Sequence, residues 1–323
     1  PAAPGSAEPN LTVGPDGRVY LSWLEPANAG YSLRFAVHDG TSWSTPQTIV
    51  TRSDFFVNWA DFPSLEVMSS NRLAAHWLQR NGAGTYAYGV RISQSADGGR
   101  TWSAPRRLPE DILGPVKNRP VQLPNGDILC PVSTETPERQ SKWAVHFERT
   151  RDLGRTWERI GPVHDGEAIR AIQPSILFLG GDRLLAIGRS RQNKVFEVES
   201  ADGGTTWKPM ALGSLPNPNS GTDAVTLRDG RHLIVYNHVP GEPGKWGGKR
   251  SPLNVAVSRD GRNWQAGVVL ESAPGEYSYP ALIQAKDGLV HITYTWKRER
   301  VRHVVLDPAR LTPRDYVAGE WPP

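Results

Sequence analysis

Short apolar segments that alternate with polar positions recur along the whole chain, and each runs into a turn of Gly, Asp or Asn. Two examples are PNLTVGPDGRVYLSW from Pro9 and PSILFLGGDRLLAIG from Pro174. Alternation with a period of two, bounded by DG or similar turns, is typical of antiparallel β-hairpins. The spacing of amphipathic helices is nearly absent. The pattern therefore predicts an all-β protein.

The hairpin segment occurs six times at a regular spacing. The copies begin near Pro9, Pro63, Pro120, Pro174, Ala224 and Pro280, roughly 50 to 57 residues apart. Six such units, each with four antiparallel strands, predict a single six-bladed β-propeller over residues 1–323. A pair of sandwiches or a solenoid fits less well, because fifty residues is too long for a solenoid coil. The fourth strand of the last unit could come from RDYVAGEW, from Arg314, or from the N-terminal residues.

A second motif runs in step with the hairpins. It reads SADGGRTW from Ser95, TRDLGRTW from Thr150, SADGGTTW from Ser200 and SRDGRNW from Ser258, with a shorter form, HDGTSW, ending at Trp43. In such a turn the Asp carboxylate accepts backbone N–H bonds, Gly adopts the positive φ of the bend and Trp packs beneath it. We expect the motif to be structural and to lie far from any active site.

Composition excludes several classes of protein. The 323 residues include 12 Trp, 32 Gly and 28 Pro, and no apolar run reaches the roughly 18 residues of a membrane span, so we expect no membrane insertion. The net charge is only +4 and the basic residues are scattered, which argues against a nucleic-acid partner. The single Cys130 excludes an internal disulfide and is expected to be a buried thiol. We expect neither a metal nor a cofactor, because no metal-ligand spacing or phosphate-binding glycine loop is present.

The Asp-containing turn resembles the Asp-box, or BNR repeat, of sialidases (neuraminidases). With six repeats, the whole chain is similar to a sialidase-like propeller. The resemblance implies a glycoside hydrolase with a carbohydrate substrate or ligand, secreted or periplasmic, whose signal is not in this chain; we expect a monomer. Asp-boxes also occur in propellers without sialidase activity, so the resemblance transfers the fold more firmly than the reaction.

Two parts of the chain resemble different branches of these proteins. The part up to about Pro109, with FFVNWADFPS and GTYAYGVRIS, resembles one branch. The part with GPVKNRPVQLPNGDILCP, PNPNSGTDAVTL and PGEYSYPALIQ resembles another. We therefore expect a chimera of two propellers, natural or engineered, joined near residues 105–115.

In a propeller the first strand of each blade lines the central channel, so the residues at its start meet at one mouth. These residues are Glu8, Asp61 with Phe62, Arg119, Gln173, Asp223 and Tyr279. Polar groups that converge in a concavity are the usual candidate for a binding or active site. The alternative is that they only hydrate the channel and pair with one another.

The resemblance to sialidases implies roles for some of these residues. Sialidases hold the sugar carboxylate with three arginines and use a Tyr nucleophile, an activating Glu and an Asp general acid/base. YSYPALIQAKDG points to Tyr279 as the nucleophile, and Asp61 is the candidate acid/base. Arg189 in LLAIGRSR and Arg250 in KRSPLNV match two of the arginines, and we add Arg119 as a third cation.

The chain departs from the family pattern in two places. Gln173 stands where the family has its activating Glu, and Glu8 opens the segment where the family has Arg-Ile-Pro. An amide cannot take a proton from Tyr279, so Glu276 or Asp223 would have to replace the missing Glu.

Two functions therefore stay open. The first is an exo-acting glycoside hydrolase on a sialic or uronic acid, with Trp59 and Tyr277 as sugar-stacking faces and Gln173 as a further contact. The alternative is a non-catalytic propeller, either a glycan-binding or interaction scaffold or an engineered or recombined propeller without activity. The convergent cations and Tyr279 favour the first function, and the missing Glu and Arg favour the second.

Overall fold

The computed structural model describes residues 1–57, 62–69, 71–84, 87–136, 142–152, 154–242, 245 and 247–322. These residues form strands β1 to β23 and one turn of 3-10 helix, η1 (Pro308–Arg310), which confirms the predicted all-β class. Within them, no helix is long and apolar enough to cross a membrane. The chain divides into two compact units, unit 1 with residues 1–113 and 281–308, and unit 2 with residues 114–280 and 309–323.

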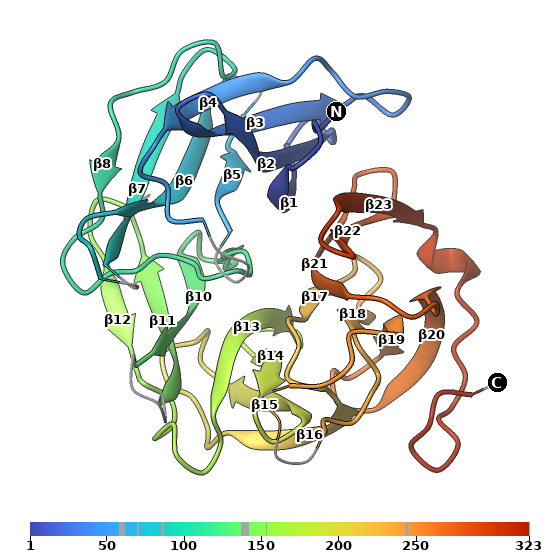
Figure 1. The fold of residues 1–323 in the computed structure, drawn as a ribbon. Coiled ribbons are helices and arrows are strands. Elements are labelled where there is room, and N and C mark those ends of the chain that lie inside the picture. Colours follow the sequence, from blue (N-terminus) through green and yellow to red (C-terminus); the bar gives the residue numbers. More distant parts are fainter. Residues whose placement is uncertain are drawn as a thin grey trace. The chain divides into compact units, whose positions relative to one another are not determined.

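Unit 1 is built from antiparallel sheets whose strands follow one another along the chain (Figure 1). The first sheet contains β1 (Ala7–Val13), β2 (Val19–Ala27), β3 (Gly30–His38) and β4 (Gln47–Arg52). The second contains β5 (Ser64–Val67), β6 (Leu73–Arg80), β7 (Tyr88–Ser95) and β8 (Arg106–Arg107). The third contains β21 (Tyr277–Gln284), β22 (Val290–Trp296) and β23 (Arg300–Leu306); the first residues of β21, up to Pro280, belong to unit 2.

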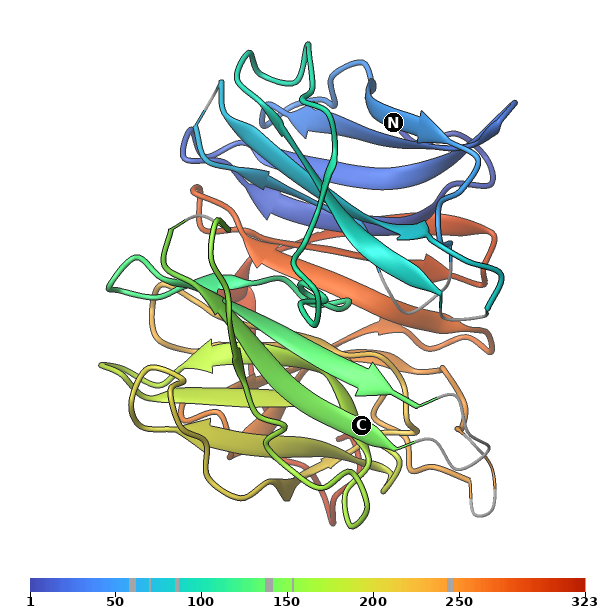
Figure 2. The ribbon, with the colours of Figure 1, turned by 90° about the vertical axis from the view of Figure 1, so that its left-hand side faces the viewer.

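Unit 2 repeats the same plan in three sheets, of which Figure 2 shows the first in green. The first contains β9 (Val121–Gln122), β10 (Ile128–Glu135), β11 (Trp143–Thr150) and β12 (Glu158–Ile160). The second contains β13 (Ala171–Phe178), β14 (Leu184–Ser190), β15 (Lys194–Ser200) and β16 (Ala211–Pro216). The third contains β17 (Asp223–Thr226), β18 (His232–Tyr236), β19 (Leu253–Ser258) and β20 (Trp264–Glu271).

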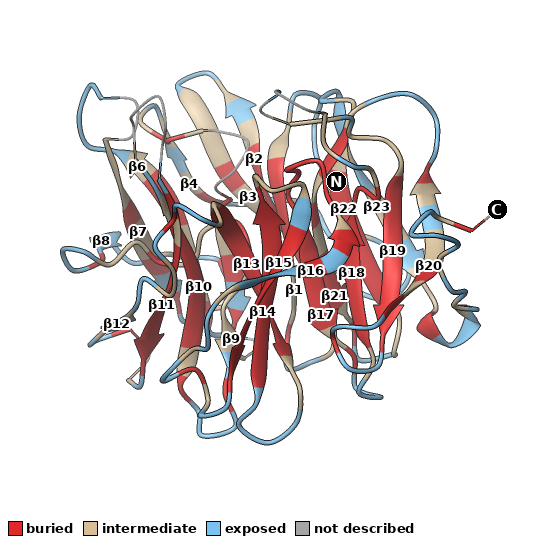
Figure 3. Ribbon diagram, turned by 90° about the horizontal axis from the view of Figure 1, so that it is seen from below, coloured by how far each residue is buried: buried red, intermediate tan, exposed pale blue. Residues whose placement is uncertain are grey.

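The hydrophobic core of each unit lies between neighbouring sheets. In unit 2, Phe147 of β11 and Phe196 of β15 are fully buried in one cluster, and Leu185 of β14 packs with Tyr236 of β18 in the next. The central strands β10, β14 and β18 are accordingly buried over most of their length (Figure 3). Burial of apolar side chains on both faces of a sheet is the main force that holds such stacked sheets together.

The last sheet differs from the others. Five sheets have the predicted four strands, whereas β21, β22 and β23 form a three-stranded sheet in the part of the chain that the structure describes. Neither expected source supplies a fourth strand. The N-terminal residues lead into β1 of the first sheet, and Arg314 of RDYVAGEW pairs with Ala266 of β20 in unit 2. The tail is held there because Tyr316 OH lies 3.0 Å from Tyr236 OH.

The Asp-boxes form the predicted hydrogen-bonded turns. In one of them, Asp202 Oδ1 accepts the backbone N–H groups of Thr205 and Thr206 at 3.0 and 2.8 Å, and Oδ2 accepts the Thr206 hydroxyl at 2.6 Å. Trp207 donates Nε1–H to Gly204 O at 3.2 Å. Equivalent bonds form around Asp97, Asp152 and Asp260. The motif therefore has the structural role that its sequence predicts.

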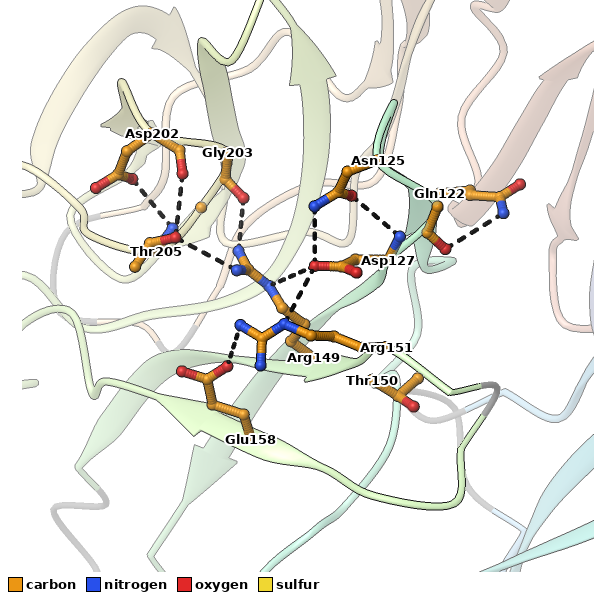
Figure 4. A network of polar contacts seen from close by, with 12 residues as sticks. Gln122, Asn125, Asp127, Arg149, Thr150, Arg151, Glu158, Asp202, Gly203 and Thr205 are labelled. Carbon is orange, nitrogen blue, oxygen red and sulfur yellow. Dashed lines mark hydrogen bonds and ion pairs between the residues drawn. The ribbon is translucent and has the colours of Figure 1, made fainter.

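The same turns fasten one sheet to the next. A Cβ atom on Gly204 would lie 2.7 Å from Leu129 Cδ2 of β10, so the turn after β15 contacts the preceding sheet at a distance that only Gly allows. Arg149 of β11, which is buried, donates to Gly203 O at 2.6 Å and to the Thr205 hydroxyl at 3.3 Å, and Asp127 lies 3.9 Å from its Nε (Figure 4). The Asp-box turn around Asp202 therefore belongs to the contact between two sheets of unit 2.

These turns predict an acid-dependent loss of stability. The pKa of the half-buried Asp152 is lowered to about 2, chiefly by the backbone N–H of Thr156 and then by its hydroxyl. The unfolded value is about 3.9, so this contribution is complete above about pH 4 and is lost as the pH falls toward 2. We expect Asp152→Asn to lower the free energy of unfolding at pH 7 and to flatten its pH dependence between about 4 and 2, measured by urea unfolding. Exposed Asp182→Asn is the control, and an unchanged pH dependence in Asp152→Asn would contradict the assignment.

Candidate functional site

Glu8 and Phe62 of the predicted mouth lie in unit 1, and the other predicted site residues that the structure describes lie in unit 2. Those in unit 2 are Arg119, Gln173, Arg189, Asp223, Arg250, Glu276, Tyr277 and Tyr279. Trp59 and Asp61 lie outside the described residues. The candidate site is therefore built from the segment that leads into β9, the first residues of β13, β17 and β21, and the ends of neighbouring strands.

Near each of these strand starts a residue other than glycine has a positive φ, including Lys117 at 63° and Asn219 at 56°. Gln173 and Tyr279 have φ angles of 58° and 50°, and each precedes a proline. The residue before proline normally adopts an extended conformation, and positive φ is uncommon outside glycine. At Gln173 the register of β13 against β14 shifts between Ile172 and Ser175. Such a bulge turns a side chain away from the sheet pattern, and strained backbone of this kind is concentrated at functional sites.

Lys117 lies at the centre of the candidate site, although the sequence analysis did not select it. Its side chain is buried, and its Nζ donates to Thr222 O at 2.6 Å, Asn118 Oδ1 at 2.7 Å and Pro280 O at 3.0 Å. Three oxygen acceptors match the three N–H bonds of an ammonium group. A single charge therefore binds segments that lie 105 and 163 residues away from it along the chain.

Burial controls the protonation of this lysine. Desolvation lowers the pKa of Lys117 to about 8; the negative charge of Asp223 opposes the shift, and the positive charges of Arg189 and Arg119 add to it. Both arginines therefore act electrostatically on the ammonium group. The result is a concentration of positive charge around one carboxylate.

That carboxylate, Asp223, ends a directed chain of hydrogen bonds. Asn118 donates Nδ2–H to Gln173 O and to the Ser175 hydroxyl, both at 2.8 Å. Ser175 in turn donates its hydroxyl to Asp223 Oδ1 at 2.8 Å, and the Ala224 N–H reaches the same oxygen at 2.9 Å. Arg119 Nη1 lies 3.9 Å from Asp223 Oδ2. Asp223 is buried and held in one orientation by donors from three segments.

Tyr279 packs against a glycine in the loop before β17. A Cβ atom on Gly221 would lie 3.0 Å from Tyr279 Cδ1 and 3.1 Å from Lys117 Cε. The tyrosine ring and the lysine stem therefore meet at this glycine. The loop itself is buried and polar: Asn217 accepts the Ser220 N–H at 2.8 Å and donates to its hydroxyl at 3.2 Å. The missing side chain at Gly221 makes room for the ring of Tyr279.

The other two predicted arginines approach the same loop. Arg189 is buried and donates Nη1–H to Asn219 O at 3.3 Å, while its guanidinium lies 5.4 Å from the ring centroid of Trp143. Arg250 accepts the Tyr277 N–H at its backbone oxygen at 3.0 Å, and Gly248 N donates to Pro218 O at 3.0 Å. The segment before β19 thus lies between the loop of residues 217–222 and β21.

A second set of residues that the sequence analysis missed surrounds Arg189. Arg191 also lies over the ring of Trp143, 4.5 Å from its centroid. Burial raises the pKa of Glu135, and Arg189 and Arg191 both oppose that shift. Cation–π contact with a buried indole fixes a guanidinium without neutralising its charge. Arg189 is therefore held in place by Trp143 and Asn219.

The remaining predicted residues differ in their exposure. Tyr277 and Gln173 are each 1% exposed, so neither presents a wide face to a sugar in this conformation. Asn237 fixes Tyr277 through a bond from Nδ2 to Tyr277 O at 3.1 Å. Glu276 is half-buried and accepts the Ser278 hydroxyl at 3.1 Å, three residues from Tyr279.

Comparison with known proteins identifies the fold. The chain matches the BNR repeat-like domain family over residues 31–292. No curated protein is significantly similar to it in sequence. A protein of unknown function from Dyadobacter fermentans DSM 18053 is 17% identical over 94% of this chain and 95% of its own, with a TM-score of 0.71.

Two sialidases are similar in structure. The Hadza microbial sialidase Hz136 is 14% identical over 95% of this chain and 66% of its own, with a TM-score of 0.70. The intramolecular trans-sialidase from Ruminococcus gnavus, solved with oseltamivir carboxylate, is 13% identical over 95% of both chains, with a TM-score of 0.66. At these identities the similarity establishes the fold, and the prediction of a six-bladed β-propeller is confirmed. The chain therefore belongs to the BNR repeat-like family of sialidase-like, six-bladed β-propellers.

Proposed function

We propose that unit 2 binds the carboxylate of a terminal acidic sugar and that the protein is a sialidase-like, exo-acting glycoside hydrolase on a sialic or uronic acid. The observation that carries the proposal is the crowding of cations around Lys117, whose stem lies beside Tyr279 at Gly221. Lys117 and Tyr279 both pack against Gly221. Burial lowers the pKa of Lys117, and repulsion from Arg189 and Arg119 lowers it further. Like charges held together in the free protein favour an anionic ligand, which relieves their repulsion.

Arginine is suited to this ligand because its planar guanidinium binds a carboxylate through two parallel hydrogen bonds. Arg189 is held by Trp143 and Asn219, so little rotamer entropy is lost when a ligand binds. Arg119 and Arg250, which are half-buried, supply the remaining cations. Membership of the BNR repeat-like family and the structural similarity to sialidases support the same class of substrate.

In the proposed reaction, the Tyr279 oxygen forms a bond to the anomeric carbon as the bond to the aglycone oxygen breaks. Asp61 is the proposed acid that protonates the departing oxygen and then activates water. A phenolic nucleophile suits an anionic sugar, because it places no second carboxylate against the first. Gln173 cannot accept the phenol proton, so we assign that role to Glu276, which lies three residues from Tyr279, or to Asp223. The water that cleaves the glycosyl-tyrosine bond restores the original anomeric configuration.

Hydrolysis of 4-methylumbelliferyl glycosides of N-acetylneuraminic acid and glucuronic acid tests this proposal. We expect the protein to release the fluorophore from one of them and Tyr279→Phe to lower kcat by about 100-fold or more, because the nucleophilic oxygen is lost. Tyr31→Phe, a half-buried tyrosine of unit 1, is the matched control and should keep wild-type activity. Release that is equal in Tyr279→Phe would reject Tyr279 as the nucleophile. No release from either glycoside would reject the hydrolase and favour a scaffold without catalysis.

Gly221→Ala tests whether the position of Tyr279 matters for the same reaction. The φ of Gly221 is not positive, so the new methyl group acts through its contacts with Tyr279 and Lys117 rather than through backbone strain. We expect kcat to fall about 10-fold or more while the melting temperature changes little. Gly84→Ala is the control, because its Cβ would meet Ala87 at an ordinary 3.5 Å. Unchanged kcat in Gly221→Ala would show that the ring position does not limit the reaction.

A further inference from the structure

The buried amine of Lys117 joins two of the residues to which the proposed chemistry assigns a role, Asp223 and Tyr279. Thr222, whose carbonyl accepts one N–H bond at 2.6 Å, directly precedes Asp223. Pro280, whose carbonyl accepts another at 3.0 Å, directly follows Tyr279. The lysine side chain is only 6% exposed, so it contacts these groups rather than a ligand in solution. Within unit 2, Lys117 therefore cross-links the segments that carry Asp223 and Tyr279.

We propose that Lys117 is a positioning residue that fixes Tyr279 relative to Asp223, and that it does so only while its amine carries three protons. The proposal rests on the proposed function in one respect, namely that Tyr279 and Asp223 act on the substrate. It adds a regulation of that site by pH, through a residue that no sequence motif marks.

Donor counting explains why protonation matters. An ammonium group has three N–H bonds, and the structure places three acceptors around it, two backbone carbonyls and Asn118 Oδ1. A neutral amine has two N–H bonds and one lone pair. After deprotonation the lone pair must face one of the three oxygens, so one bond is replaced by repulsion. A buried carbonyl that loses its donor is costly, and the segment that carries it has to move or admit water.

The electrostatic surroundings bring this change into the range of pH in which proteins function. Burial lowers the pKa of Lys117 to about 8, with Asp223 opposing the shift and with Arg189 and Arg119 adding to it. An exposed lysine would lose its proton near 10.4. Asp223 is in turn paired with Arg119 at 3.9 Å, which weakens its hold on the lysine proton. Loss of the proton therefore begins at weakly alkaline pH.

The change would reach Tyr279 through two contacts. One is the carbonyl of Pro280, next to a tyrosine whose φ of 50° is already unusual for its residue type. The other is the packing of the ring beside the lysine stem at Gly221. A tyrosine that is held against backbone strain returns toward a relaxed conformation when one of its supports is lost. Asp223 keeps its bonds to Ser175 and Ala224, so we expect Tyr279 to respond more strongly.

Nuclear magnetic resonance tests the proposal without any assumption about substrate. The full chain, labelled with 13C and 15N in lysine and with 13C in the tyrosine rings, is titrated from pH 6.5 to 10.5. Lys117→Met and Tyr279→Phe assign the two signals, and Lys117→Arg assigns the lysine signal if Lys117→Met does not fold. We expect the Lys117 side-chain signal to titrate near pH 8 and the Tyr279 ring signal to follow the same midpoint. A Lys117 midpoint near 10.4, or a Tyr279 signal that does not change with Lys117, would overturn the proposal.

Activity provides a second readout that a purely structural role would not move. With whichever glycoside the protein hydrolyses, we expect wild-type kcat to exceed that of Lys117→Met about 10-fold at pH 7 and to approach it above pH 9.5, where both lack the charge. Exposed Lys194→Met, the matched control, should keep the wild-type pH profile. A constant ratio between wild type and Lys117→Met across this range would reject the pH dependence. If neither glycoside is hydrolysed, the proposed function fails, whereas the resonance titration still decides the role of Lys117.

Discussion

A lysine ammonium can be buried only where oxygen atoms accept all of its N–H bonds, and this requirement organises the candidate site. Lys117 meets it with oxygens from the segments before β17 and within β21, and the neighbouring Asn118 binds the carbonyl of Gln173 in β13. The entry to β9 is therefore bonded to the entries of three other strands. Apolar burial between sheets holds the blades together, but it is not directional and does not fix the exact position of one strand end. Hydrogen bonds to a buried charge are directional, and they determine where Asp223 and Tyr279 lie.

The features of the fold that depend on residues close together in the sequence could be predicted from it. Alternating hairpins and the Asp-boxes are determined within fifteen residues, because turn chemistry and a period of two are local properties. The last sheet could not be predicted in the same way. Arg314 pairs with Ala266 of β20 rather than with β23, and that choice depends on which strand edge lies near the tail and on the contact between Tyr316 and Tyr236.

In the candidate site, too, the sequence predicts what the repeats determine locally and does not predict contacts between distant segments. Aligning the six repeats placed Arg119, Gln173, Asp223 and Tyr279 at equivalent positions, and the described part of unit 2 shows that a network of contacts connects them. The repeats could not reveal Lys117, because its acceptors are backbone oxygens that look alike in any sequence. They could not reveal the positive φ of Tyr279 either, since a residue before proline is normally extended. The roles of Trp59 and Asp61, the single domain over residues 1–323 and the chimeric junction near residues 105–115 stay predictions.

The amide of Gln173, where sialidases have a carboxylate, affects the charge of the candidate site. A carboxylate at this 1% exposed position would have to be charged inside the protein or take up a proton, and it would offset part of the charge of Lys117 and the arginines. The amide leaves the site more cationic. Under the proposed function, such a site suits an acidic sugar, and a group other than Gln173 takes up the proton of Tyr279.

Calorimetric titration with free sugars tests the central claim most directly, because it needs no catalysis. The claim predicts that N-acetylneuraminic acid or glucuronic acid binds, that the uncharged N-acetylmannosamine and glucose do not, and that Arg189→Gln weakens binding of the acid about 10-fold or more through the lost charge-assisted bonds. Added salt should weaken binding of the acid further. Equal heats for acidic and neutral sugars, or an affinity unchanged in Arg189→Gln, would contradict the account.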